Sequence, residues 1–234
     1  MGRRPKSRGS SAGAAAAPAP PPPAERLLDE ALLPEALAHL AAVCPRFAAA
    51  LETIGPPEIR RREGGFAGLL RVLVDQQVSV AAGRAIWARI EEAGAATPEA
   101  VLARDEEALR ALGLSRPKAR YARAAAEAVT SGALCFERQR ALPYAEAEAE
   151  LTAIKGVGPW TASIYHMFCV GRGDLLPAAD LALQEAARRL YDLPERPTAE
   201  ALAALGAPWR PWRSAASLML WRYYAVEKKR EGVS

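Results

Sequence analysis

The sequence predicts an all-α protein. Half of its 234 residues are hydrophobic, which is enough to bury a sizeable core in one large domain or two small ones. Alanine is abundant and β-branched runs are scarce, a composition that favours helices. Apolar residues recur at helical spacing from Leu27 onward, and no segment is a convincing strand. No apolar run is long enough to span a bilayer.

Residues 1–24 form a low-complexity tail that we expect to be disordered. Arginine, serine and glycine give way to alanines and then to a run of four prolines, Pro20 to Pro23, and such a segment cannot bury enough apolar surface to order itself. An arginine pair near the start lacks the apolar region that an export signal requires. We therefore expect a cytoplasmic protein.

The net charge of +4 is unevenly distributed along the chain. The tail contains no acid and four basic residues, so the rest of the chain is formally neutral. Charge alone therefore does not indicate nucleic-acid binding unless the basic side chains gather on one face. The basic residues of the tail are Arg3, Arg4, Lys6 and Arg8.

Residues 25–234 are expected to form a succession of helices. One or two amphipathic helices over residues 27–41 are broken near Pro34. N-caps mark later starts: Ser79 precedes a helix to Ala93, Thr97 precedes Pro98, and Ser115 begins a long helix to Val129. The remaining helices are expected at 66–74, 144–154, 180–191, 198–205 and 211–226.

The cysteines do not have the spacing of a metal site. Cys44, Cys135 and Cys169 are widely separated, and their odd number argues against a complete set of disulfides. We expect reduced, mostly buried thiols. Only His39 and His166 supply imidazoles, which argues against a zinc site.

A glycine hairpin between two expected helices is the most informative local feature. It runs Lys155-Gly156-Val157-Gly158-Pro159-Trp160-Thr161. Gly156 and Gly158 allow positive φ and the close approach of another backbone, and Pro159 opens a helix without losing a needed donor. The free N–H groups at that helix start predict a phosphate site.

The hairpin followed by Asp180 resembles the helix-hairpin-helix-GPD superfamily of DNA repair glycosylases. The resemblance covers residues 40–230 and implies two all-α subdomains with the active site in the cleft between them. It also implies DNA-phosphate contacts by the hairpin and by the capped basic turn at 115–118. The residues concerned are Gly156, Val157, Gly158, Thr161, Ser115 and Lys118. The alternative is a plain corner between two helices with a polar cap.

The segment from Phe66 to Ser79 resembles the second, broad-specificity type of 3-methyladenine DNA glycosylase. In that family the residue matching Gln77 wedges into the duplex where the flipped nucleotide was. The alternative is that Gln76 and Gln77 only cap the loop before Ser79.

The resemblance assigns the chemistry to Asp180, which matches the family's essential carboxylate. Asp is also a favoured N-cap, and both roles are compatible. Trp160 and Trp221 match aromatic residues of the base pocket, whose faces stack on cationic alkylated purines. Tryptophans in helices are more often core residues, and we assign Trp209 and Trp212 to packing.

The resemblance predicts a monofunctional glycosylase that hydrolytically excises alkylated bases from double-stranded damaged DNA. Bifunctional members carry a nucleophilic lysine where this chain has Trp160, which cannot form a Schiff base. We expect a monomer without organic cofactor, iron–sulfur cluster or membrane partner. The family implies a structural monovalent cation at the carbonyls of Thr152, Ile154 and Val157. Open alternatives are a glycosylase for mismatched or oxidised bases, and a non-catalytic DNA-binding module.

Overall fold

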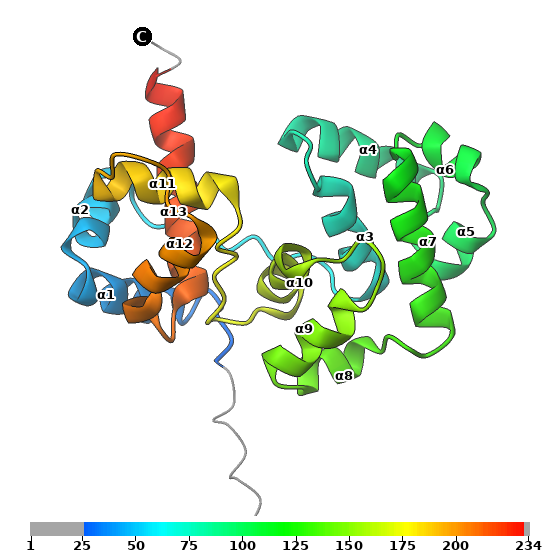
Figure 1. The fold of residues 1–234 in the computed structure, drawn as a ribbon, viewed down its shortest axis with the longest axis horizontal. Helices are drawn as coiled ribbons and strands as arrows, with labels where there is room; N and C mark the ends of the chain where they lie inside the picture. The colour runs from blue at the N-terminus through cyan, green and yellow to red at the C-terminus, as the bar shows by residue number, and fades with distance from the viewer. Residues whose placement is uncertain (1–25, 232–234) are drawn as a thin grey trace, which may run out of the picture.

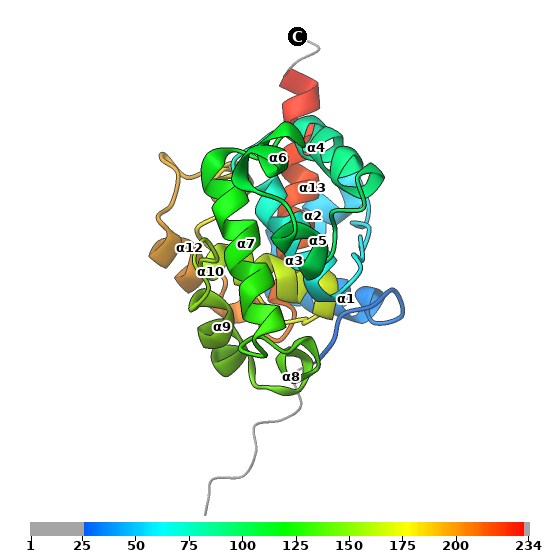
Figure 2. The same cartoon turned by 90° about the vertical axis from the view of Figure 1, so that its right-hand side faces the viewer.

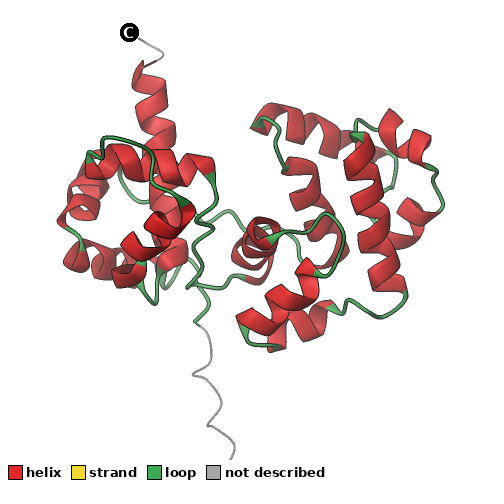
Figure 3. Cartoon of the chain, in the orientation of Figure 1, coloured by secondary structure: helices red, strands yellow, loops and turns green. Residues whose placement is uncertain are grey.

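The computed structural model describes residues 26–231 (Figure 1). Within that range the regular structure is helical (Figure 3), and the one β feature is an isolated bridge between Leu27 and Arg172. The predicted all-α class is confirmed. In the same range no helix is long and apolar enough to cross a membrane. The tail predicted at residues 1–24 lies outside the described residues.

The helices follow one another with short connections. In chain order they are α1 (Leu33–Val43), α2 (Pro45–Ile54), α3 (Gly65–Asp75), α4 (Val80–Glu92), α5 (Pro98–Leu102), α6 (Glu106–Ala111), α7 (Arg116–Thr130), α8 (Phe136–Ala141), α9 (Tyr144–Thr152), α10 (Pro159–Tyr165), the π-helical turn η1 (His166–Val170), α11 (Leu181–Tyr191), α12 (Ala199–Leu205), the 3₁₀ turn η2 (Ala207–Trp209) and α13 (Arg213–Glu231).

Two separate hydrophobic cores divide these helices into two lobes. The first lobe contains α3 to α10 and η1, with Leu69 and Leu73 of α3 packed among the alanines of α7. The second contains α1, α2, α11, α12 and α13, so it joins the N-terminal and C-terminal parts of the chain. Figure 1 shows the lobes side by side, and Figure 2 shows α7 of the first lobe in front of α13 of the second.

Side-chain caps mark the starts of several helices. Ser79 accepts from the backbone N–H of Ala82 at 3.2 Å, and Ser115 accepts from that of Lys118 at 3.4 Å. Thr97 caps α5 in the same way. The predicted N-caps are therefore confirmed, and each satisfies one of the otherwise unpaired donors of a helix start.

The N-terminal region differs from the prediction. Residues 27–32 are not helical, and Pro34 lies in the first turn of α1 rather than in a break between helices. Leu27 instead forms the bridge to Arg172, and Leu28 is buried in the second core. The expected helix fails because this backbone pairs with the segment that follows η1: the N–H of Leu28 donates to the carbonyl of Gly171 at 2.8 Å. Hydrophobic periodicity does not report such a long-range pairing.

Candidate active site

Asp180 lies at the start of α11, where the chain enters the second lobe. Its Oδ1 accepts the backbone N–H groups of Ala182 at 2.9 Å and Leu183 at 3.0 Å. The predicted N-cap role is confirmed. The side chain is only half-buried, so capping leaves the carboxylate accessible from one side.

Two indoles complete the shell around this carboxylate. Trp160 of α10 donates its Nε1–H to Asp180 Oδ2 at 2.9 Å, and Trp221 of α13 donates to Oδ1 at 3.2 Å. The two tryptophans come from different lobes, and Trp221 packs against both cores. Four N–H donors therefore fix the orientation of one carboxylate at the junction of the lobes.

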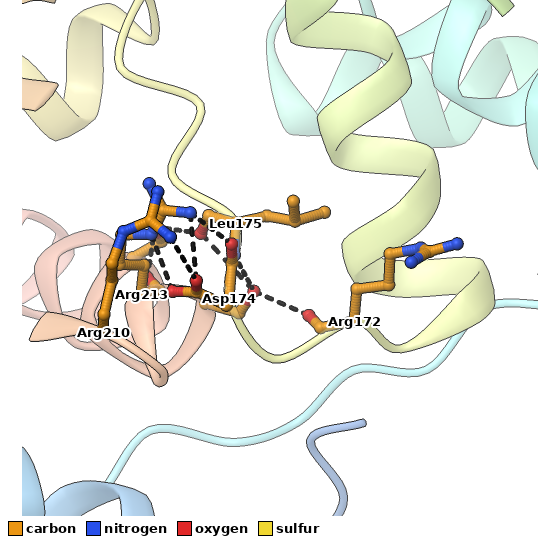
Figure 4. A network of polar contacts seen from close by, with 7 residues as sticks. Arg172, Asp174, Leu175, Arg210 and Arg213 are labelled. Carbon is orange, nitrogen blue, oxygen red and sulfur yellow. Dashed lines mark hydrogen bonds and ion pairs between the residues drawn. The ribbon is translucent and has the colours of Figure 1, made fainter. Parts of the chain in front are cut away.

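The segment that leads to Asp180 is anchored on the beginning of α13 (Figure 4). Arg213 binds the Asp174 carboxylate through two hydrogen bonds, Nε to Oδ1 at 2.7 Å and Nη2 to Oδ2 at 3.1 Å, and its Nη2 also donates to the Asp174 carbonyl at 2.7 Å. Ser214 Oγ donates to the carbonyl of Arg172 at 2.7 Å and accepts the N–H of Leu175 at 3.0 Å. These bonds hold the segment before Asp180 to α13, the helix that carries Trp221.

Trp209 and Trp212 are buried in the second core, next to the start of α13. Their exposed fractions are 1% and 2%, and Phe47 of α2 meets Trp209 edge-on at 5.3 Å between ring centroids. The assignment of both tryptophans to packing is confirmed.

A cleft of about 750 Å³ runs between the lobes and contains Asp180, Trp160 and Trp221 in its wall. Its lining is richer in basic than in acidic side chains, although the chain after its tail is formally neutral. Charge is therefore segregated onto one concave surface, which is what binding of a polyanion requires. The basic lining includes Arg60, Arg62, Arg84, Arg222 and Lys229.

Phe168 is a site residue that the sequence analysis missed. Its ring lies 5.8 Å from that of Trp221 at an interplanar angle of 32°, and it lines the cleft with Trp160 and Ile164. The three occur at intervals of four along α10 and η1, so they share one helix face. This four-residue spacing is the feature of the sequence that could have identified Phe168 as a neighbour of Trp160.

The two glycines of the hairpin differ in what their missing side chains allow. Gly156 has φ +90°, and an added Cβ would lie 2.0 Å from the ring of Tyr121, so this glycine permits close packing within the chain. Gly158 has φ −99°, which corrects the prediction of positive φ there, and nothing lies within 4 Å of its missing Cβ. The open side of the hairpin is therefore at Gly158.

Lys118 is not positioned as a phosphate ligand, which corrects that prediction. Its exposed fraction is 8%, and its Nζ donates to the carbonyls of Val74 at 2.7 Å and Gln76 at 2.6 Å. These carbonyls end α3 and need donors. Burial lowers the pKa of the Lys118 ammonium. Ser115, beside it in sequence, is exposed at the start of α7.

Val157 and Thr161 are also buried and make their contacts within the protein. The Val157 side chain is 4% exposed and its N–H donates to the carbonyl of Ile154 at 3.0 Å. Thr161 is 2% exposed and accepts from Gln76 Nε2 at 2.8 Å. Both side chains are buried where the hairpin meets α3, so neither is open to a phosphate from solvent. The carbonyl that accepts the Val157 N–H, that of Ile154, is one of the three carbonyls of the predicted cation site. That site stays a prediction.

The loop after α3 presents Gln77 to solvent. Gln76 holds this loop to the hairpin through the bond to Thr161 and a second bond to the carbonyl of Gly156 at 3.1 Å. Gln77 has φ +53°, a conformation that residues other than glycine rarely adopt and that persists where the surroundings enforce it. Its neighbours Val78 and Ser79 line the cleft.

More than half of the chain matches a known family. Residues 70–211 match the family model of the HhH-GPD superfamily base excision DNA repair proteins, and the chain belongs to this superfamily. It is 30% identical over 198 residues to DNA-3-methyladenine glycosylase 1 of Schizosaccharomyces pombe, covering 81% of this chain and 87% of that protein.

Two further relatives extend the comparison. The solved structure of the Schizosaccharomyces pombe 3-methyladenine DNA glycosylase Mag1 in complex with abasic DNA superimposes with a TM-score of 0.76 at 30% identity, covering 80% of this chain and 95% of that one. The YfjP protein of Bacillus subtilis is 34% identical over 125 residues, which span 53% of this chain but only 44% of that protein.

Proposed function

We propose that this protein is a monofunctional DNA glycosylase that excises alkylated bases of the 3-methyladenine type from duplex DNA. One observation carries the proposal. Asp180 is held by two indoles in the wall of a basic cleft between the lobes. An accessible, oriented carboxylate beside aromatic faces suits the removal of a cationic base from a sugar.

DNA binding begins with backbone contacts. Gly158, half-buried at the start of α10 with open space beside it, offers backbone groups to a phosphate, and exposed Ser115 at the start of α7 offers its hydroxyl. The basic cleft attracts the polyanion. Extruding a nucleotide costs a few kcal/mol, and Gln77, exposed on a loop tied to the hairpin, fills the gap that the base leaves.

The extruded base enters a pocket with aromatic walls. Trp160, Phe168 and Trp221 line it, and their π faces attract the positive charge of an alkylated purine. Undamaged purines lack that charge, so they gain less from the same stacking.

Asp180 supplies negative charge where the sugar develops positive charge. Among residues 26–231 it forms no ion pair, and its four hydrogen-bond partners are neutral N–H groups. The carboxylate charge is therefore available to an oxocarbenium-like transition state and to the water that attacks it. A cationic base leaves as a neutral molecule, so little acid catalysis is required.

Water is the nucleophile in this proposal, since Trp160 occupies the position of the lyase lysine. The cleft, the hairpin and Asp180 all come from one chain, so a monomer is sufficient. We place its action in the cytoplasm on nucleoid DNA, without organic cofactor or iron–sulfur cluster. A monovalent cation at the carbonyls of Thr152, Ile154 and Val157 would steady the hairpin next to DNA.

The experiment is incubation with methylated duplex DNA and identification of the released bases by mass spectrometry. We expect free 3-methyladenine and abasic sites. Release only of oxidised or mismatched bases from other duplexes would assign a different lesion class. Binding without release of any base would reduce the protein to a DNA-binding module.

A further inference from the structure

Arg62 lies beside the aromatic wall of the cleft, on the connection between the two lobes. Its guanidinium carbon is 5.5 Å from the centroid of Phe168, and its backbone N–H donates to the Phe168 carbonyl at 3.0 Å. Phe168 contacts Trp221, which donates to Asp180. A chain of contacts thus joins this guanidinium to the carboxylate.

The charge of Arg62 is only partly neutralised. Asp75 Oδ2 lies 2.9 Å from Arg62 Nη1, but the same oxygen also accepts from Arg71 Nε at 3.2 Å. One carboxylate between two guanidiniums leaves the group with a net positive charge. The Arg62 side chain is 33% exposed and lines the cleft. A guanidinium has five N–H donors, so donors remain for a ligand.

We infer that Arg62 is a specificity-determining residue, the side chain that sets how fast neutral damaged purines are removed relative to cationic ones. It donates hydrogen bonds to the acceptor edge of such a base, for example hypoxanthine, when the base stacks on Phe168. This inference rests on the proposed glycosylase function. It assigns to one side chain the different electrostatic requirement of a neutral leaving base.

The chemistry explains why a cation helps one class and not the other. When the C1′–N9 bond of a neutral purine breaks, both bonding electrons go to the base, which becomes an anion. The water oxygen bonds to C1′, and the proton that water loses passes by way of Asp180 or solvent to the departing base. A guanidinium beside the base stabilises that anion before it is protonated. A base that is already cationic leaves neutral, so it gains nothing from Arg62 and is weakly repelled.

The test compares Arg62→Gln with wild type on two duplexes, one with hypoxanthine and one with 7-methylguanine, under single-turnover conditions with saturating enzyme. We expect the hypoxanthine rate to fall about 10- to 100-fold, the range for losing a hydrogen bond to a charged donor. The 7-methylguanine rate should change less than about threefold, because that leaving group develops no negative charge. Arg62→Lys keeps a point charge and should retain part of the hypoxanthine activity.

Arg71→Gln is the matched control. It removes one positive charge from the same Asp75 oxygen, but Arg71 lies over the ring of Trp87 rather than that of Phe168. It should change the ratio of the two rates much less than Arg62→Gln does, because Arg62 and its N–H donors stay beside Phe168. Thermal unfolding of each variant shows whether it is folded.

The outcomes separate the inference from the function on which it rests. Equal losses on both lesions in folded Arg62→Gln, or the same change of ratio in Arg71→Gln, would overturn the inference. A wild-type protein that removes 7-methylguanine but not hypoxanthine would also overturn the inference. That result would leave the proposed function intact. A wild type that removes neither lesion, nor 3-methyladenine, would remove the proposed function and the inference with it.

Discussion

Substituting Gly158 by aspartate separates DNA binding from folding. Gly158 is the N-cap of α10, with φ −99°, ψ 177° and open space around its missing Cβ. Aspartate fits this backbone without strain and is a favoured N-cap residue that also suits the positive end of a helix. The variant should be as stable as wild type or more stable by about 0.3–1 kcal/mol.

Its DNA affinity should fall nonetheless. If the hairpin receives a phosphate at Gly158, the new carboxylate occupies that place and repels the ligand. Losing one charge-assisted hydrogen bond corresponds to about 1.5–3 kcal/mol, or about 10- to 150-fold in Kd. The loss should be similar for damaged and undamaged duplex, because phosphate contacts do not read bases.

Equilibrium binding at fixed salt, together with thermal unfolding, measures both effects. Gly158→Ala adds a methyl group without charge and should lose less affinity at unchanged stability. Gly156→Ala should instead destabilise the fold by about 1–3 kcal/mol, because its φ is +90° and its Cβ would meet Tyr121. Wild-type affinity of Gly158→Asp for both duplexes would refute the phosphate role of the hairpin.

Three further predictions follow from buried or missing side chains. Lys118→Met should lower the free energy of unfolding by about 1–3 kcal/mol, since it leaves two carbonyls without their donor, and it should not change the salt dependence of DNA binding; a smaller salt slope would restore Lys118 as a phosphate ligand. Burial lowers the pKa of His166 from 6.5 to about 4, so only the unfolded chain takes up a proton between these values. The stability present above pH 6.5 should therefore fall by about 3 kcal/mol as the pH approaches 4, and urea unfolding of His166→Gln should lack this part of the pH dependence. Borohydride should trap no covalent complex with DNA, whereas a trapped band that Lys229→Ala abolishes would identify a lyase lysine in the cleft.

The features predictable from the sequence are those encoded by a few adjacent residues. Ser79 and Ser115 cap the helices that follow them, because a side-chain oxygen and the N–H three residues on need no tertiary partner. The short α2 was missed because Cys44 and Pro45 provide no side-chain hydrogen bond at its start. Asp180 was found because its spacing from the hairpin resembles a known family.

The features that could not be predicted depend on distant segments meeting. Lys118 has the local sequence of a phosphate ligand, yet α3 ends beside it and its carbonyls take the ammonium. Arg62 and Phe168 are far apart in the chain and meet only because the connection between the lobes passes η1. The basic run Arg60-Arg61-Arg62 is visible in the sequence, but its place in the wall of the cleft and the stacking of Arg62 on Phe168 are not.

Asp180→Asn is informative because it removes the charge and keeps most of the shape. Asparagine caps helices about as well as aspartate, so Ala182 and Leu183 keep an acceptor. The amide nitrogen then faces the N–H of Trp160 and cannot accept it. We expect a stability loss of about 1–2 kcal/mol from that unpaired donor and DNA affinity within a few fold of wild type.

Base release by this variant tests the central claim most directly. Wild-type protein and Asp180→Asn, each shown to be folded and saturating, are incubated with methylated duplex DNA, and free 3-methyladenine is measured in a single turnover. The account predicts release by wild type and a loss of at least about 100-fold in the variant. Release at a near wild-type rate by folded Asp180→Asn would contradict the assignment of Asp180 and with it the mechanism.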